Sequence, residues 1–468
     1  MKRKAICLLL ALLLFLPLNV TAEKETTTTV LIYMCGSDLE TESSLASQDL
    51  QEMIAAGIPE DSHLTVLVET GGAKEWHMSA VSNQKNQRFE VTEKGLIPRA
   101  DYLGRKNMGA SGTLTDFLQW SMMYAPADRT VLIIWDHGNG PFGGCCMDEM
   151  FEDDTLILPE MAQGIKTGMF GKKLDAVVFD CCLMASAEIA LTLAPYADYM
   201  AASQEIITST GLDYTVWIQA LLNDPDMDIP SLLCLKADSM IASFVKKGQE
   251  GMCFSVIELS KMKALQEALD AFGRGAEELL KGSKKTQFLN ARKRLLSYGE
   301  FIEGEEPTDL VDIQMLCDRF SSLLPAETKA LSAALKDAVR YNKTMLATRD
   351  HASGLSVFLP KDTVETDPEY LIIYPEIAGM KDYAAFAAHL GNILLEEAEK
   401  EKDQKENGVL EGLGNLFGNL LGISTPAPSP TPIPEEPSPY PGLWAELSQP
   451  IPEDKDPYPL LWNELKGK

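Results

Sequence analysis

The stretch TVLIIWDHGNG at residues 130–140 decides the fold class. Its first six residues are apolar or β-branched without alternation, which is typical of a strand buried on both faces of a parallel sheet. The same pattern recurs in LDAVVFDCCLM at residues 174–184 and in TTTVLIYMCG at residues 27–36. Each run ends abruptly in small, polar or reactive residues. Strands of this kind predict an α/β fold with a mostly parallel sheet covered by helices on both faces.

Hydrophobic periodicity places further elements around these runs. Ser37 is expected to cap a helix that ends before Gly57, with Glu40 in the capping-box position. Residues 77–91 alternate loosely, as in a hairpin near a sheet edge. The remaining predictions are helices over 114–124, 158–167, 185–194 and 383–400, and strands over 64–68, 199–203, 252–258 and 354–360. The elements alternate as in an α/β protein.

One domain is expected over residues 23–400. Its core strands fall within residues 27–220 and 352–360, and residues 225–346 are largely helical. The length of 468 residues and the 45% content of hydrophobic residues are sufficient for such a core.

The two ends of the chain differ from this domain. Residues 1–22 have three basic residues, an apolar run and small residues before a plausible cleavage point, which is typical of a secretory signal peptide. Because no later apolar run reaches about 18 residues, we expect no membrane-spanning helix and a secreted or envelope-associated protein.

The C-terminal end contains a Gly/Leu-rich amphipathic linker at residues 401–424 and a Pro-rich tail at residues 425–468. We expect the tail to be disordered. It contains the pattern Tyr-Pro-x-Leu-Trp twice, starting at Tyr440 and Tyr458. Duplicated peptide ligands for an envelope or protein partner would bind with avidity. A disordered tail without a partner is an equally open alternative.

Charge and cysteine content exclude several classes of function. The chain has 69 acidic and 41 basic residues, a formal net charge of −28. A nucleic-acid-binding protein needs a basic surface, so that class is excluded and a cationic partner or substrate is favoured. Eight Cys follow the signal, too few for a small disulfide scaffold, and their spacing does not favour structural zinc. At least one Cys is therefore expected to have a chemical role.

Two reactive side chains follow neighbouring runs of the predicted sheet. His137 follows one strand, and Cys181 and Cys182 follow another. Function in open parallel sheets collects at the carboxyl ends of the strands, where a thiol nucleophile and an imidazole acid/base could meet. The helix predicted to begin near Ala185 would stabilise a Cys182 thiolate through its first N–H groups. Buried, purely structural roles for the Cys and the His are the alternative.

Several blocks together resemble the clostripain-like cysteine peptidases, whose catalytic fold is that of the caspases. The blocks are LIYM at 31–34 with DLE at 38–40, FLQW at 117–120 through PAD at 126–128, WDHGNG at 135–140, FDCCLMASAE at 179–188, ASQE at 202–205 and GLSVFLP at 354–360. The resemblance covers residues 27–395 and implies a caspase-like α/β/α sandwich with cysteine endopeptidase activity.

The resemblance implies that His137 and Cys182 form the catalytic dyad. Cys181 stands where the family has a small residue, so either thiol could be argued from spacing. Strand alternation favours Cys182, because it places Asp180 and Cys182 on one side and Cys181 on the other. The backbone N–H groups of Gly138 and Cys182 would form the oxyanion hole.

The resemblance also implies cleavage after Arg or Lys in peptide or protein substrates. Asp180 is expected in the pocket for the basic side chain, with Ser203 and Glu205 as further candidates for its lining. A peptidase with a changed preference is one alternative. Another is a catalytically altered or inactive surface adhesion or scaffold protein that acts through its C-terminal repeats.

The expected chemistry requires no cofactor. Clostripain itself is calcium-dependent, so calcium is considered at the cluster of acidic residues in one loop. An acidic, solvated loop is the favoured alternative. The residues are Asp148, Glu149, Glu152, Asp153 and Asp154.

Overall fold

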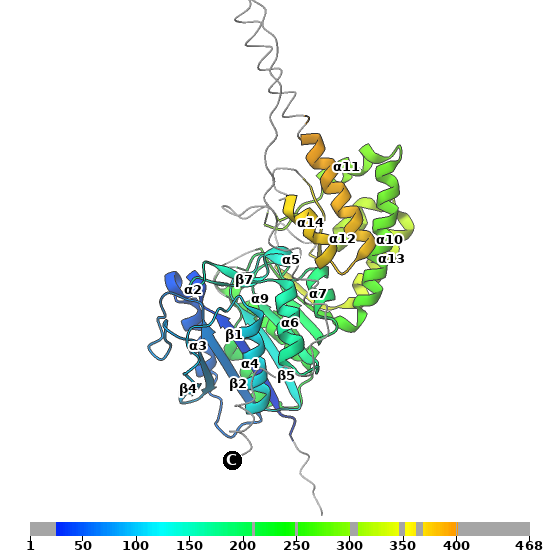
Figure 1. Ribbon diagram of the computed structural model, residues 1–468. Helices are drawn as coiled ribbons and strands as arrows, with labels where there is room; N and C mark the ends of the chain where they lie inside the picture. The colour runs from blue at the N-terminus through cyan, green and yellow to red at the C-terminus, as the bar shows by residue number, and fades with distance from the viewer. Residues whose placement is uncertain are drawn as a thin grey trace, which may run out of the picture.

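A large sheet forms the centre of the computed structural model (Figure 1). The structure describes residues 25–207, 211–248, 251–299, 308–345, 352–361, 368–398 and 400. The expected signal peptide (1–22), linker (401–424) and Pro-rich tail (425–468) lie outside the described residues.

Nine strands form this sheet in the order β12-β10-β9-β8-β5-β1-β2-β3-β4. The five strands from β9 to β2 are parallel, and an antiparallel pair is added at each side. The mostly parallel sheet is therefore confirmed. The strands are β1 (Thr28–Cys35), β2 (Leu64–Gly71), β3 (Gln87–Thr92), β4 (Gly95–Ala100), β5 (Arg129–Trp135), β8 (Leu174–Asp180), β9 (Ala197–Ala202), β10 (Met252–Glu258) and β12 (Val339–Met345).

Helices cover both faces of the sheet because its central strands are apolar on both faces. In β1, Leu31 and Tyr33 belong to one hydrophobic core and Val30 and Ile32 to the other. The first core includes side chains of α4 (Ser111–Tyr124), α6 (Leu158–Gly168) and α7 (Ala187–Leu193). The second includes those of α3 (Leu45–Ala55), α8 (Tyr214–Asn223) and α9 (Ile229–Lys246). The chain therefore forms the expected α/β/α sandwich.

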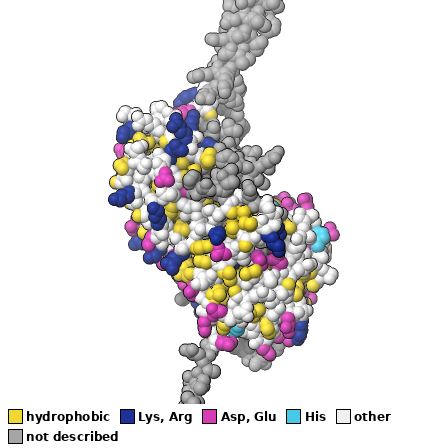
Figure 2. Space-filling view, turned by 180° about the vertical axis from the view of Figure 1, so that it is seen from behind, with side chains coloured by type: hydrophobic (Ala, Val, Ile, Leu, Met, Phe, Trp, Pro, Cys, Tyr) yellow, Lys and Arg dark blue, Asp and Glu magenta, His cyan; other side chains and the backbone are white. Residues whose placement is uncertain are grey.

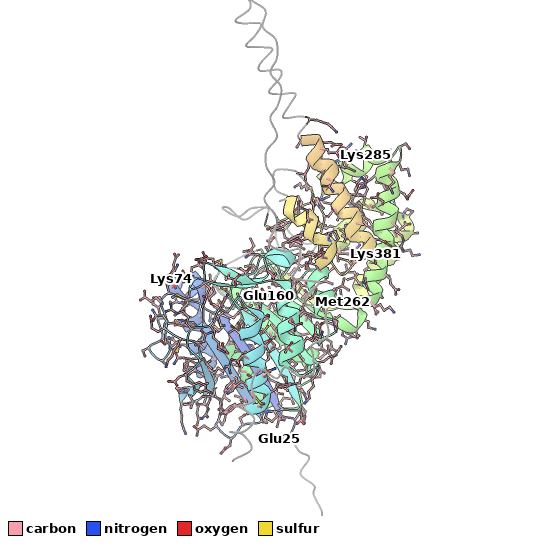
Figure 3. The ribbon with its side chains drawn as sticks, in the orientation of Figure 1. Glu25, Lys74, Glu160, Met262, Lys285 and Lys381 are labelled. Atoms are coloured by element: carbon pink, nitrogen blue, oxygen red, sulfur yellow. The ribbon has the colours of Figure 1, made fainter. Side chains whose placement is uncertain are left out.

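A helical part lies beside the sandwich and shares its first core (Figure 1). In the view from behind, Lys and Arg side chains are spread over this part (Figure 2). Met262, Lys285 and Lys381 mark it in Figure 3, and Lys74 marks the opposite side of the molecule. Its elements are η1 (Leu259–Lys261), α10 (Met262–Lys281), α11 (Lys285–Lys293), β11 (Leu310–Asp312), α12 (Ile313–Phe320), α13 (Pro325–Ala338), β13 (Ser356–Phe358), α14 (Pro368–Ile377) and a helix over 381–398.

The helix expected after β1 is instead two helices, α2 (Ser37–Ser43) and α3. The break falls at Ser44, whose φ of 55° lies in the left-handed region. Ser37 is the first residue of α2 rather than its N-cap, and its Oγ donates to Asp136 Oδ1 and accepts from the N–H of Leu39 at 3.4 Å. The Glu40 carboxylate accepts from the backbone N–H and Oγ of Ser47 rather than closing a capping box. Tertiary contacts have replaced the local capping pattern.

Strand predictions in the second half of the chain need two corrections. The strand expected over 354–360 is β13, which pairs with β11 in a separate two-stranded sheet. The main sheet instead ends in β12, which falls in the region predicted to be helical and has a largely polar sequence. An edge strand can be polar, because it has a neighbour on one side only. The hairpin expected from residue 77 is formed by β3 and β4 and begins at Gln87.

Within the described part of the chain, no helix has the length and apolar character needed to cross a membrane.

A buried arginine holds the segment around β13 in place. The Arg292 guanidinium is 1% exposed, donates to the carbonyl oxygens of Leu359 and Pro360, and pairs with Asp309 at 3.3 Å. Because the charge is fully desolvated, its removal leaves the Asp309 carboxylate buried next to carbonyl oxygens that have lost their donor.

We predict that Arg292→Met destabilises the fold by about 3–5 kcal/mol, measured by urea denaturation or the melting temperature. Arg274→Met is the matched control. Arg274 is exposed and pairs with Asp382 at the surface, so its replacement should change stability by less than about 1 kcal/mol. Equal melting temperatures for the two variants would contradict the role assigned to Arg292.

Candidate active site

A cavity of about 240 Å³ opens at the carboxyl ends of β1, β5 and β8. The chain passes from β1 to β2 on one side and from β5 to β8 on the other, so the connections diverge between β1 and β5. Such a switch point leaves a crevice outside the strand ends. The cavity is lined by Leu39, Leu45, Asp49, Trp135, Asp136, His137, Gly138, Asn139, Asp180, Cys181, Cys182, Leu183, Ile206, Ile207 and Gly211.

Two polar pairs join the segments that follow β1 and β5. The Ser37 hydroxyl donates to Asp136 Oδ1 at 2.5 Å, and His137 Nε2 lies 2.7 Å from Asp38 Oδ1. The two segments face each other because Met34, near the end of β1, pairs with Trp135 at the end of β5. Ser37 has a φ of 46°, a left-handed conformation that is unfavourable for serine and is common near functional sites. Burial raises the pKa of Asp136 to about 7.

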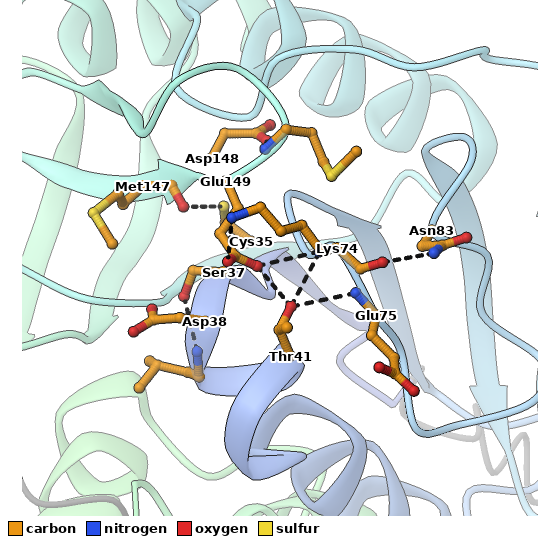
Figure 4. A network of polar contacts seen from close by, with 12 residues as sticks. Cys35, Ser37, Asp38, Thr41, Lys74, Glu75, Asn83, Met147, Asp148 and Glu149 are labelled. Carbon is orange, nitrogen blue, oxygen red and sulfur yellow. Dashed lines mark hydrogen bonds and ion pairs between the residues drawn. The ribbon is translucent and has the colours of Figure 1, made fainter.

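Helix α2 is fixed from its outer side by a small network (Figure 4). Thr41 Oγ1 donates to Glu149 Oε2 at 2.6 Å, and Lys74 Nζ donates to Glu149 Oε1 at 3.0 Å. Glu149 follows β6 (Cys145–Asp148), so the network ties α2 to the segment beyond β5. It thereby supports the position of Asp38 next to His137.

The two adjacent cysteines have different surroundings. Cys181 is 2% exposed, and burial raises its pKa well above the usual value. Cys182 is partly exposed, and its Sγ accepts a hydrogen bond from the backbone N–H of Ile207 at 3.2 Å. Nucleophilic cysteines need access and thiolate character, which a buried thiol with a raised pKa lacks.

Helix α7 begins two residues after the predicted start near Ala185. Its first residue is Ala187, five residues after Cys182, and the Ser186 side chain accepts from the N–H of Ile189. The stabilisation of a Cys182 thiolate by this helix stays a prediction.

Gly138 lies directly against the backbone of Cys182. A Cβ atom on Gly138 would be 2.2 Å from the carbonyl oxygen and 2.9 Å from the nitrogen of Cys182. Real Cβ atoms do not approach this closely, so a side chain at position 138 would force the two segments apart. The backbone groups expected to form the oxyanion hole are thus brought together.

Asp180 lies at a buried wall of the cavity. It is 6% exposed, and its Oδ2 accepts from the N–H of Leu212 at 3.2 Å and from the Tyr214 hydroxyl at 3.0 Å. Burial raises its pKa to about 6. Among the residues that line the cavity, none is Lys or Arg.

Ser203 and Glu205, which are expected to line the pocket, are not among the described residues that line this cavity. Ser203 is fully buried, and its hydroxyl donates to the carbonyl oxygen of Glu205. Glu205 Oε1 accepts from the N–H groups of Ile206 and Gly299. Both side chains hold the strand end behind the wall that Ile206 and Ile207 form.

The acidic residues considered for calcium do not form a cation site. Asp148 accepts from the N–H groups of Met108 and Met150, and Glu149 binds Thr41 and Lys74. In the described ranges, no group of three or more His, Cys, Asp or Glu side chains is arranged to hold a metal ion. The side chains Asp148, Glu149, Glu152, Asp153 and Asp154 therefore do not fit a calcium ion as a set.

Sequence reasoning missed two acidic residues of the site, Asp38 and Asp49. Asp49 lines the cavity from α3, where Ala46, Leu50 and Met53 form the buried face around it. A carboxylate on the apolar face of a helix was the available signal, because such a group is rarely buried without a partner. Asp38 lies in the first turn of α2 within a segment that carries the family resemblance, but no sequence pattern indicates that it meets His137.

Comparison with known proteins agrees with the geometry of the site. Residues 32–404 match the model of peptidase family C11, the clostripain family. The chain belongs to the clostripain family. It is therefore a cysteine peptidase that acts on peptide or protein substrates, as the resemblance implied.

Individual relatives are distant. Clostripain of Hathewaya histolytica is 21% identical over 399 residues, which are 70% of this chain and 74% of that protein. A secreted C11 cysteine protease of Bacteroides thetaiotaomicron in complex with an irreversible peptide inhibitor has a TM-score of 0.57 at 19% identity, covering 77% of this chain and 99% of that one. An inactive zymogen C11 protease of Parabacteroides distasonis has a TM-score of 0.58 at 21% identity, covering 76% and 98%. These structures share the fold.

We predict that Gly138→Ala abolishes most peptidase activity, because the added methyl group would separate the backbones of residues 138 and 182. Turnover of a fluorogenic peptide should fall by at least about 100-fold, the range for loss of one oxyanion donor.

Gly112→Ala is the control, since a Cβ atom at this position in α4 meets nothing within 4 Å. This variant should retain activity. A fully active Gly138→Ala enzyme would show that the close approach is not needed.

Proposed function

We propose that this clostripain-family peptidase cleaves after Arg or Lys by a dyad of Cys182 and His137, and that it works outside the cell. The observation that carries this proposal is the buried Asp180 carboxylate, which lines the same cavity as His137 and Cys182. Membership of the clostripain family accounts for the reaction class. The proposal concerns the catalytic residues and the preference for Arg or Lys before the scissile bond.

The environment of Asp180 supports recognition of a cation. Its carboxylate is buried, the described residues that line the cavity include no Lys or Arg, and Lys236, which lies outside the lining, compensates the charge only in part. A substrate guanidinium or ammonium group would provide the missing charge through strong hydrogen bonds. A neutral side chain would leave the carboxylate unpaired, which is a large penalty in a buried site.

The contact between Asp38 and His137 supports the acid/base role of the imidazole. When Nε2 donates its proton to Asp38, Nδ1 of the neutral ring is free to accept the thiol proton of Cys182. The thiolate then attacks the scissile carbonyl carbon, and the oxyanion receives N–H groups of Gly138 and Cys182. The imidazolium returns the proton to the leaving amine, and water hydrolyses the acyl-enzyme.

Residues 1–22 support export, because they have the three-part pattern of a secretory signal. The duplicated Tyr-Pro-x-Leu-Trp units, starting at Tyr440 and Tyr458, support retention at an envelope or protein partner.

The direct test uses the chain from residue 23 onward and matched fluorogenic peptides that end in Arg, Lys, Asp or Leu, with and without a chelator. Cleavage confined to the Arg and Lys peptides supports the proposal. Preferential cleavage of the Leu or Asp peptide would overturn it.

Cys182→Ala is predicted to abolish cleavage, while Cys181→Ala keeps most of it. The reason is that the Cys181 thiol is buried and protonated, whereas Cys182 is accessible in the cavity. Titration with an active-site-directed covalent label would report the number of reactive thiols in each variant. Labelling that survives in Cys182→Ala and is lost in Cys181→Ala would reverse the assignment.

Asp180→Asn should lower kcat/KM for Arg peptides by an amount that corresponds to about 2–5 kcal/mol, because it removes a buried charge pair with the substrate. In the unmodified enzyme, kcat/KM for these peptides should fall as the pH drops through about 6, where Asp180 becomes protonated.

The control is Asp175→Asn, at the opposite end of β8. Its carboxylate accepts from the N–H of Thr130, a bond that an Asn oxygen can preserve. It should leave the preference unchanged. If Asp180→Asn still distinguishes Arg from Leu as the unmodified enzyme does, Asp180 is not the specificity residue.

A further inference from the structure

A second carboxylate, that of Asp49, shares the cavity wall with Asp180. It reaches the cavity from α3, whereas Asp180 comes from the end of β8. Each residue is only 6% exposed. A Cβ atom on Gly211 would lie 3.5 Å from both oxygens of Asp180 and 3.5 Å from Oδ2 of Asp49. Two separate elements therefore direct their carboxylates toward one point of the cavity.

The hydrogen bonds of the pair leave one oxygen of each carboxylate for a ligand. Asp49 Oδ2 accepts from Trp135 Nε1 at 2.7 Å, and Asp180 Oδ2 accepts from Leu212 and Tyr214. The Oδ1 atoms accept no hydrogen bond from the described residues and are not among the sealed polar atoms. A ligand with two N–H donors that point in different directions would satisfy both.

The protein supplies less positive charge than the two carboxylates require. Lys236 of α9 is the buried cation nearest to them, and burial lowers its pKa to about 7. Its Nζ lies 3.7 Å from the centroid of the Trp217 ring, and no described residue hydrogen-bonds it. Its charge reduces the repulsion between the two carboxylates. Because Lys236 does not line the cavity, the carboxylates can still bind a cation there.

The remaining groups around Asp49 do not remove this deficit. Burial and the charge of Asp180 raise the pKa of Asp49, Glu52 raises it further, and Lys247 lowers it. Asp213 adds another negative charge near Lys236, and the neutral Tyr214 hydroxyl donates to Asp180. Two acidic groups this close titrate as a pair, so their charges are linked.

We propose that Asp49 is a second specificity residue of the substrate pocket and that the Asp49–Asp180 pair selects a guanidinium over an ammonium group. This inference rests on the proposed preference for basic side chains. A guanidinium is planar and presents five N–H donors in a fixed fork, so it can bond oxygens of both carboxylates at once. The ammonium of Lys is a compact, strongly hydrated charge that gains less from two fixed acceptors.

The experiment compares kcat/KM for matched peptides that end in Arg, Lys or norleucine. The unmodified enzyme should prefer Arg over Lys. Asp49→Asn keeps an oxygen for Trp135 Nε1 and removes one charged acceptor, so Arg cleavage should fall by about 10- to 100-fold. Lys cleavage should fall less, which reduces the Arg/Lys ratio toward one. Asp180→Asn should lower both rates.

The pH profile separates a pocket role from a structural one. Because the charge of Asp180 raises the pKa of Asp49 and two such close acids titrate as a pair, the loss of Arg cleavage on acidification should move to lower pH in Asp49→Asn. Cleavage of the norleucine peptide should keep its profile. A substitution that only loosened α3 would lower all three rates together and leave the pH midpoint in place.

Glu52→Gln is the matched control for the Arg/Lys ratio, because Glu52 lies one turn further along α3 and does not line the cavity; its charge raises the pKa of both Asp49 and Asp180, so it is not a control for the pH midpoint. It accepts from the N–H of Tyr214, which a glutamine oxygen can also do. It should leave the Arg/Lys ratio within about twofold, far below the effect of a lost charged hydrogen bond.

The outcomes distinguish this inference from the proposed function. An unmodified enzyme without any preference for Arg or Lys over norleucine refutes the proposed function. An enzyme that prefers basic residues, but whose Arg/Lys ratio and pH midpoint are unchanged in Asp49→Asn, refutes the role of Asp49 alone.

Discussion

The parallel pairing of β1, β5 and β8 is the constraint on which the whole site depends. Their side chains are buried on both faces, so polar residues can be accommodated only where the strands end. The register aligns Met34, Trp135 and Asp180 across the three strands. The segments that follow therefore meet at one edge. Because the connections diverge between β1 and β5, that edge remains open as a cavity.

The buried charges of this edge are poor contributors to stability. Asp49, Asp136, Asp180 and Lys236 are almost fully buried, and burial is the main cause of each pKa shift. Desolvation of a charge often outweighs the attraction of its partner, so apolar residues would be expected to give a more stable fold. Such groups are typical of functional sites, where they are kept for binding or chemistry.

The helical part supports the cavity from outside the sheet. Gln204 donates to Asp312 at 3.0 Å and accepts from the N–H of Gly354 at 2.7 Å. Glu205 is held by the N–H of Gly299. These contacts join the end of β9 to segments far along the chain, so the cavity wall at Ile206 and Ile207 depends on residues beyond the sandwich.

The sequence by itself determined the five parallel strands, the layer order and the family, because continuous apolar runs and the motifs at 135–140 and 179–188 are local signals. It also placed His137, Asp180 and Cys182 at strand ends. Only the tertiary structure decided that Cys181 is sealed in the core, that Asp38 meets His137, and that Asp49 joins Asp180. Those facts depend on contacts between residues about 100 or more positions apart, or on burial, neither of which has a periodic signature. The edge strand β12 was not predicted for the same reason. Its sequence is largely polar, so only its pairing with β10 makes it a strand.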